Sequence, residues 1–244
     1  MKEAESVTVD RPKDYFGKDL EAMSFALNYH RWIADEFAPY IGPCVAEVGA
    51  GTGNFTEFVL RRGAKKLVAF EPSANMYPLL KEKYISDGRV EVRNSLFGDS
   101  SDDFFGTFDS VLYVNVLEHI ELDAEELCVA YRTLKIGGQL LVFVPALQWL
   151  YSELDRKLGH FRRYGKKHLS DVVTGAGFEI TCVKYFDLAG IIPWYIGFVL
   201  MKKTMTGGNV SAYDRFIVPP MRFLEERVAP PIGKNILLVA KKKR

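Results

Sequence analysis

The feature that most constrains this chain is the stretch at residues 45–55, which reads VAEVGAGTGNF. Val45, Ala46 and Val48 are small, partly β-branched residues typical of a buried parallel strand. The alternating glycines that follow can adopt backbone angles closed to other residues, and they let a ligand lie against the main chain. A helix after such a turn directs its free N–H groups toward it, which suits a carboxylate or a phosphate. The stretch therefore predicts a strand, a ligand-binding turn and a helix.

The spacing of the glycines distinguishes between cofactors. A dinucleotide fingerprint has glycines at its first, third and sixth positions, but the sixth position from Gly49 is Asn54. Glu47 instead precedes the first glycine by two positions, and the pattern Glu-x-Gly-x-Gly-x-Gly resembles motif I of the class I S-adenosylmethionine (SAM) methyltransferases. The resemblance implies that SAM binds at this turn. The cofactor-binding residues that it implies here are Glu47, Gly49, Ala50, Gly51, Gly53 and Asn54.

Two further predicted strands supply candidates for the nucleoside. Residues 67–70 predict a buried strand that ends at Glu71, 18 positions after Gly53. A carboxylate has two acceptor oxygens and can accept both ribose hydroxyls. Because NAD and SAM folds share this acid, it indicates nucleoside binding without choosing the cofactor. Residues 90–93 predict the next strand, and the resemblance assigns Ser95 and Leu96 just beyond it to the adenine.

A second match to the family covers residues 108–120, FDSVLYVNVLEHI, which resemble its motif IV strand. The strand brings Asn115 to the carboxyl edge of the sheet, where open α/β folds bind ligands. The resemblance implies that Asn115 contacts the methionine part of SAM. Residues 108–120 contain neither Asn-Pro-Pro nor Pro-Cys, so the amino-group and cytosine-C5 methylation motifs are missing there. A third match is Lys-x-Gly-Gly at residues 135–138, before an apolar strand.

Two histidines are the candidate catalytic residues. SAM supplies the leaving group of methyl transfer, so the protein has to align the acceptor and exclude water. A hydroxyl acceptor benefits from a base of near-neutral pKa, and His119 and His160 are the candidates. For each, a hydrogen-bonded structural histidine is the alternative. Residues 158–164, LGHFRRY, resemble a bacterial type-11/12-like subgroup of mostly unassigned substrate, in which Arg163 and Tyr164 are candidates for orienting a polar or anionic acceptor.

Two apolar segments supply further substrate candidates. A helical pattern from about residue 20 to Phe37 contains Tyr29; in the family this helix covers the cofactor, and a core tyrosine is the alternative. The segment 188–201 contains Trp194 and has 14 residues, whereas a membrane span takes about 20. It is predicted to form a lid over an apolar substrate, an interfacial membrane helix or an oligomer contact.

Composition narrows the setting. The net charge of +1 gives no global attraction to nucleic acid or to an anionic membrane. Three cysteines without Cys-x-x-Cys spacing favour a reduced, cytoplasmic setting and argue against a zinc site, so we expect no metal. The N-terminus lacks the apolar core of a signal peptide.

We therefore expect one SAM-methyltransferase domain over residues 1–244. Its fold is α/β and Rossmann-like, with a seven-stranded, mostly parallel sheet, helices on both faces, an antiparallel last strand and a helical insertion between strands six and seven. We expect a covering helix in residues 1–40, a core at 41–186, a lid at 187–232, and the last strand with a basic tail at 233–244. Within these parts, residues 1–17 are expected on the surface, and residues 146–168 are expected to form a polar connection. Helices are expected over residues 73–84, with Ser73 as the cap, and over residues 213–227.

The expected activity is SAM-dependent methyl transfer to a hydroxyl or amine of a sugar, a lipid-linked compound or a secondary metabolite. We expect a monomer or homodimer that uses neither nucleic acid nor a transmembrane segment, with peripheral membrane contact through 188–201 as an option. The alternatives are a non-catalytic SAM-binding accessory protein and, third, a nicotinamide oxidoreductase.

Overall fold

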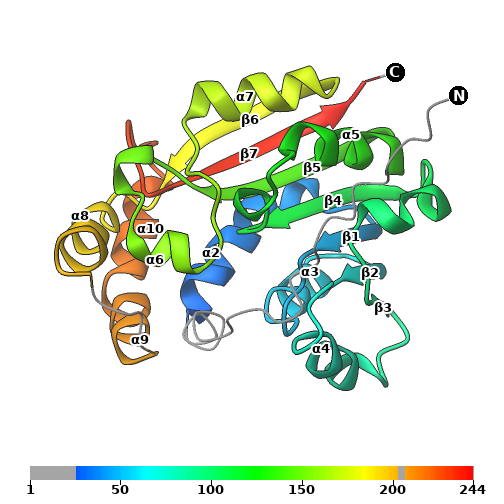
Figure 1. Ribbon diagram of the computed structural model, residues 1–244, viewed down its shortest axis with the longest axis horizontal. Helices are drawn as coiled ribbons and strands as arrows, with labels where there is room; N and C mark the ends of the chain where they lie inside the picture. The colour runs from blue at the N-terminus through cyan, green and yellow to red at the C-terminus, as the bar shows by residue number, and fades with distance from the viewer. Residues whose placement is uncertain (1–25, 203–206, 244) are drawn as a thin grey trace, which may run out of the picture.

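A seven-stranded sheet organises the chain (Figure 1). The computed structural model describes residues 26–202 and 207–243. The strand order is β3-β2-β1-β4-β5-β7-β6, and β7 runs antiparallel between β5 and β6. The predicted fold class, including the antiparallel last strand, is confirmed. The strands are β1 (Cys44–Val48), β2 (Lys66–Phe70), β3 (Val90–Arg93), β4 (Phe108–Val114), β5 (Leu134–Pro145), β6 (Phe178–Phe186) and β7 (Asn235–Lys242).

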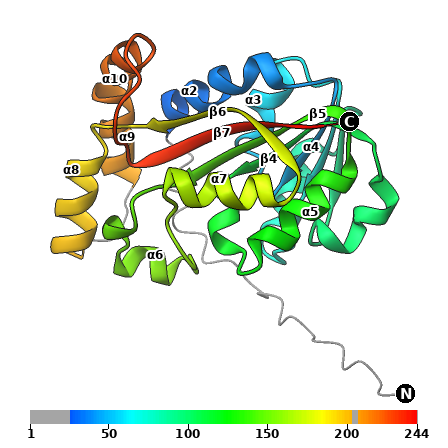
Figure 2. The same ribbon diagram turned by 90° about the horizontal axis from the view of Figure 1, so that it is seen from above.

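Helices cover both faces of the sheet, as Figure 2 shows from above. One face carries α2 (Leu27–Phe37), α3 (Thr56–Arg61) and α4 (Tyr77–Tyr84). The opposite face carries α5 (Asp123–Thr133) and α7 (Lys166–Gly175). This two-sided cover explains why the central strands are apolar at successive positions rather than at alternate ones.

Several shorter helices connect these elements, and a group of helices lies at one end of the sheet. The insertion between β6 and β7 consists of α8, the π-helix η5, α9 and α10, at the left of Figure 1 together with α6. The bounds are η1 (Ala38–Tyr40), η2 (Gly98–Phe104), η3 (Leu117–His119), η4 (Gln148–Leu150), α6 (Glu153–Lys157), α8 (Ile191–Trp194), η5 (Tyr195–Leu200), α9 (Gly207–Phe216) and α10 (Val218–Glu225).

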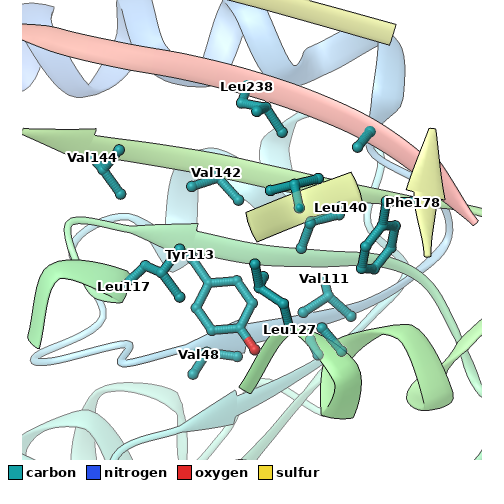
Figure 3. Packing of buried hydrophobic residues seen from close by; sticks show 14 of the residues in the cluster. Val48, Val111, Tyr113, Leu117, Leu127, Leu140, Val142, Val144, Phe178 and Leu238 are labelled. Atoms are coloured by element: carbon teal, nitrogen blue, oxygen red, sulfur yellow. The ribbon is translucent and has the colours of Figure 1, made fainter. Parts of the chain in front are cut away.

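The core follows the period of two along each strand. Tyr113 and Val142 belong to the cluster under α5 and α7, which also includes Leu127 of α5 (Figure 3). Their neighbours Leu112 and Leu141 belong to the cluster under α2 and α3. Successive side chains of a strand point to opposite faces, so each central strand contributes to both clusters.

Two predictions about helices were wrong. The helix expected from Ser73 begins at Tyr77, without a side-chain cap, because residues 73–76 form a turn in which Met76 and Tyr77 donate to the Ser73 carbonyl. The helix expected from Tyr213 to Arg227 is divided at Ile217 into α9 and α10. Proline lacks an N–H and fits the first turn of a helix, and residues 219–220 are both proline.

The connection predicted at residues 146–168 contains a helix that we did not predict. Ser152 and Asp155 form a capping box that starts α6, in which each side chain bonds the backbone N–H of the other residue. The predicted surface segment 1–17 and the first part of the helix predicted from residue 20 lie outside the described residues. Across residues 26–202 and 207–243, every helix is too short or too polar to cross a membrane.

The central position of β5 gives a test of the packing. Leu141 is fully buried, whereas Leu79 on α4 is 52% exposed. We expect Leu141→Ala to lower the free energy of unfolding by about 2–5 kcal/mol, because it removes buried methyl groups and leaves a cavity. Leu79→Ala is the matched control and should change it by less than about 1 kcal/mol. Urea unfolding of both variants measures this, and equal losses would contradict the assignment of Leu141 to the core.

Candidate functional site

The glycine turn after β1 adopts a backbone that other residues would strain. Gly49, Gly51 and Gly53 have φ angles of 68°, 58° and 75°. A Cβ on Gly53 would lie 2.6 Å from a ring carbon of Tyr84. The N–H groups of Gly49 and Ala50 donate to the Phe70 carbonyl at 2.9 and 3.1 Å, which fastens the turn to the end of β2.

Glu71 lies directly against this turn. Its side chain is buried and accepts the Gly51 N–H at 2.7 Å and the Ser73 N–H at 2.9 Å. Asn94, which the sequence analysis did not single out, donates its amide to the Glu71 carbonyl at 2.9 Å. A carboxylate offers about four lone-pair positions, so two N–H donors leave capacity for two hydroxyl groups. The residues present therefore fit a ribose.

Glu47 supports the turn from inside the protein. It is 4% exposed, and its carboxylate accepts the Thr56 hydroxyl at 2.6 Å. Burial raises the pKa of Glu47 to about 7, although the Thr56 hydrogen bond opposes this. Lys83 and Tyr84 of α4 both donate to the Gly53 carbonyl, at 2.8 and 2.9 Å. Contacts from α3 and α4 thus hold both ends of the turn.

The other predicted cofactor residues follow neighbouring strands. Asn115 comes directly after β4 with a φ of 53°, and its N–H donates to the Phe143 carbonyl at 2.8 Å. Ser95 and Leu96 come after β3 and are half-buried. The Ser95 hydroxyl lies 3.0 Å from the Ser100 hydroxyl. The carboxyl ends of the adjacent strands β3, β2, β1 and β4 therefore bring these residues to one edge of the sheet.

A second polar cluster follows β4. The rings of His119 and His160 meet edge to face with 4.5 Å between centroids, and Glu118 beside them is 1% exposed. Burial lowers the pKa of His119 to about 3, and the nearby His160 adds to this. Burial also raises the pKa of Glu118 to about 7. The structure therefore brings the two candidate histidines together and adds Glu118, which the sequence analysis had not selected.

Asp155 orients His160 of this cluster through a hydrogen bond. Its fully buried carboxylate lies 3.0 Å from His160 Nδ1 and accepts Arg163 Nε at 2.9 Å. Burial raises the pKa of Asp155, but the His160 hydrogen bond and the Arg163 charge prevail and bring it to about 2. The Arg163 guanidinium also lies 4.5 Å from the Trp194 ring centroid. The Ser-x-x-Asp capping pattern at Ser152 was the sequence signal that could have located Asp155.

The rest of the LGHFRRY stretch fastens the segment after β4. The Tyr164 hydroxyl donates to Asp123 Oδ2 at 2.7 Å, and Arg162 Nη1 donates to the same oxygen at 2.6 Å. The Phe161 N–H donates to the Glu118 carbonyl at 2.8 Å. Tyr164 is fully buried. In this structure the stretch therefore works as a clamp on residues 117–123.

Two predicted substrate residues have structural partners. Tyr29 is buried between Trp32, Phe143 and Phe186, and its hydroxyl donates to Asn235 at 3.0 Å. This environment matches the core tyrosine that the sequence analysis kept as an alternative. Trp194 is half-buried and donates its indole N–H to the Leu150 carbonyl at 3.1 Å.

Comparisons with known proteins find similarity to methyltransferases. Residues 46–142 match the family model of a methyltransferase domain. A tRNA U34 carboxymethyltransferase from Helicobacter acinonychis is 28% identical over 125 residues, 50% of this chain and 47% of that protein. The alignment thus spans about half the length of that curated relative.

Solved structures of methyltransferases are similar over most of the chain. A SAM-dependent methyltransferase from Archaeoglobus fulgidus has a TM-score of 0.63 at 15% identity, covering 93% of this chain and 98% of that one. Phospholethanolamine N-methyltransferase 2 from Haemonchus contortus, in complex with phosphomonomethylethanolamine and S-adenosylhomocysteine, has a TM-score of 0.64 at 15% identity, covering 94% and 58%. At these identities the likeness shows the fold alone.

The buried Glu47 predicts a pH dependence of stability. Its pKa is about 7 in the folded chain and about 4.3 when unfolded. At a pH between these two pKa values, the unfolded chain has released a proton that Glu47 keeps in the folded chain. The contribution of Glu47 to the free energy of unfolding therefore falls as pH rises. We expect Glu47→Gln to remove this loss, so that its free energy of unfolding rises by about 3 kcal/mol relative to the parent from pH 4 to pH 8.

Urea unfolding of Glu47→Gln and the parent at both pH values tests this. The exposed Glu82→Gln on α4 is the control for the loss of one carboxylate. A difference between Glu47→Gln and the parent that stays constant from pH 4 to pH 8 would contradict the prediction.

Proposed function

We propose that this chain transfers the methyl group of SAM to a small-molecule acceptor. The chain belongs to the class I SAM-dependent methyltransferases by its fold and by the match over residues 46–142. The observation that carries the proposal is the positive-φ glycine turn, with the Glu71 carboxylate 2.7 Å from the Gly51 N–H. When bound, SAM supplies an activated methyl group on a sulfonium leaving group.

The residues at the strand ends have separate roles in this proposal. Glu71 accepts the ribose hydroxyls, while Ser95 and Leu96 border the adenine. Asn115 and the turn hold the methionine end, because Asn115 follows the strand adjacent to β1. Glu47 keeps the turn in place through Thr56. The residues of the turn itself are Gly49, Ala50, Gly51, Gly53 and Asn54.

In this proposal the methyl acceptor lies beside η3, the short helix at Leu117–His119. His119 comes shortly after Asn115 in the chain and its ring contacts that of His160, so these two histidines are the groups proposed to act on the acceptor atom. Arg163 and Tyr164 act as positioning residues, since both are buried and bonded to Asp155 and Asp123. Alignment of acceptor and methyl group is the main contribution that a protein makes to such a displacement.

We propose a hydroxyl or amine of a sugar, lipid-linked or secondary metabolite as the acceptor. An apolar portion of the acceptor is supported by the exposed apolar side chains of the insertion. Ile192, Ile196 and Leu200 are 67%, 47% and 59% exposed, and Trp194 connects their segment to Arg163. The insertion then acts as a lid, as part of a single domain that works as a monomer or homodimer.

Three alternatives remain as outcomes of the tests. An accessory protein would bind SAM without turnover. A tRNA acceptor is suggested by the name of the Helicobacter relative, but the alignment covers half of each chain and the net charge is +1. A nicotinamide oxidoreductase is disfavoured by the glycine spacing.

Titration calorimetry with SAM and with NADH tests the proposal. We expect micromolar SAM affinity and no NADH signal. In Glu71→Ala the SAM affinity should be at least tenfold weaker, because the carboxylate that accepts the two ribose hydroxyls is lost, which costs about 1.5 kcal/mol or more of binding free energy. Glu82→Ala, an exposed glutamate of α4, is the control.

Glu71 also bonds the Gly51 and Ser73 N–H groups, so thermal unfolding of Glu71→Ala has to accompany the titration. NADH binding without SAM binding would overturn the proposal. Once SAM binding is established, methyl transfer to metabolite and tRNA pools decides between an enzyme and an accessory protein.

A further inference from the structure

We propose that Glu118, His119 and His160 bind a divalent transition-metal ion at the carboxyl end of β4. One ligand atom from each of the three side chains lies within 4.8 Å of the other two. Ligands about 2.0–2.2 Å from a shared ion lie roughly 3–4 Å from one another. Small side-chain rotations therefore bring the three atoms to coordination distance.

A buried carboxylate oxygen points to a missing ligand. Glu118 is 1% exposed, and within the part of the chain that the structure describes its Oε2 has no hydrogen-bond partner. An unpaired buried carboxylate oxygen is costly, and an ion is one of the few partners that satisfies it. Glu118 is held at this place by its backbone, since its carbonyl accepts the Phe161 N–H at 2.8 Å.

Both histidines have the support that metal ligands need. His160 Nδ1 lies 3.0 Å from Asp155 Oδ1, which directs Nε2 away from Asp155. The His119 ring has a hydrogen bond to the backbone of Leu158. Metal-binding histidines commonly donate their second ring nitrogen to a carboxylate or a carbonyl, which fixes the tautomer and the ring. Asp155 is in turn held by Arg163, whose Nη2 lies 2.8 Å from Asp155 Oδ1.

The ligand set selects the class of ion. Two imidazole nitrogens and one carboxylate suit Zn²⁺, Fe²⁺, Co²⁺ or Mn²⁺ better than Mg²⁺ or Ca²⁺, which prefer oxygen ligands. Three protein ligands leave positions open, as in catalytic rather than structural sites. The expectation of no metal, which came from the cysteine spacing, did not consider a site built from histidines and a glutamate.

The open positions suit an acceptor oxygen, and this step rests on the proposed function. A hydroxyl bound to the ion would have a lowered pKa and would release its proton to solvent. The oxygen would then form the C–O bond as the S–CH3 bond breaks, and the electron pair of the broken bond would remain on sulfur. Within the acceptors proposed above, the site therefore favours a hydroxyl over an amine.

Metal content of the purified full chain tests the site directly. The chain is stripped with a chelator, dialysed against Zn²⁺, Co²⁺, Mn²⁺ or Mg²⁺, and analysed by elemental mass spectrometry. We expect about one Zn²⁺ or Co²⁺ per chain, visible d–d absorption for Co²⁺, and little Mg²⁺. In Glu118→Gln and His160→Gln the dissociation constant should rise at least about tenfold.

Matched variants separate a lost ligand from a lost fold. Glu125→Gln and His168→Gln change exposed residues of α5 and α7 and should bind the ion like the parent. Glu118→Gln and His160→Gln should keep the parent's SAM affinity. Metal that stays below about a tenth of an equivalent, or that binds the ligand variants like the parent, would overturn the site. Absent SAM binding in a chain that binds the ion would overturn the proposed function instead.

Discussion

The docking of the glycine turn on the end of β2 is the contact on which the rest of the site depends. The turn donates two N–H groups to the Phe70 carbonyl and a third to the Glu71 carboxylate. Within this turn, Gly49, Gly51 and Gly53 adopt positive φ angles. Because the turn lies so close to β2, the N–H groups of the turn and the acid at the strand end face the same space. A nucleoside and its attached group can therefore be bound by adjacent elements.

The segment after β4 depends on a different set of interactions, which come from much later in the chain. Residues 117–123 form a short 3₁₀ turn and the start of α5, with little regular hydrogen bonding of their own. Arg162 and Tyr164 converge on Asp123, and Phe161 binds the backbone of Glu118. Tyr164, Arg163 and Asp123 are buried, and their bonds support a role in positioning Glu118 and the two histidines.

These two regions differ in how far the sequence could predict them. The turn, Glu71 and Asn115 are each defined by residues adjacent to a predicted strand, so local pattern and strand order are sufficient. The clamp joins residues 41 positions apart, and no local periodicity encodes such a pair. In the sequence, Glu118 is only one residue of the stretch 108–120 that resembles motif IV. Its burial and its unpaired oxygen exist only in the folded chain, so the sequence could not single it out. The cap expected at Ser73 failed for a related reason, since the Ser73 carbonyl forms a turn before the helix begins.

The insertion connects the clamp to the helix that was expected to cover the cofactor. Asp214 of α9 is buried and accepts the N–H groups of Asn28 and Tyr29 at 3.0 and 2.8 Å, so a residue far along the chain caps α2. Such a cap contributes about 1 kcal/mol and satisfies N–H groups that the first turn of a helix leaves unpaired. At the other end of the insertion, Trp194 lies over Arg163. A displacement of the insertion would therefore disturb both the start of α2 and the support of His160, which couples any movement of the insertion to the proposed acceptor site.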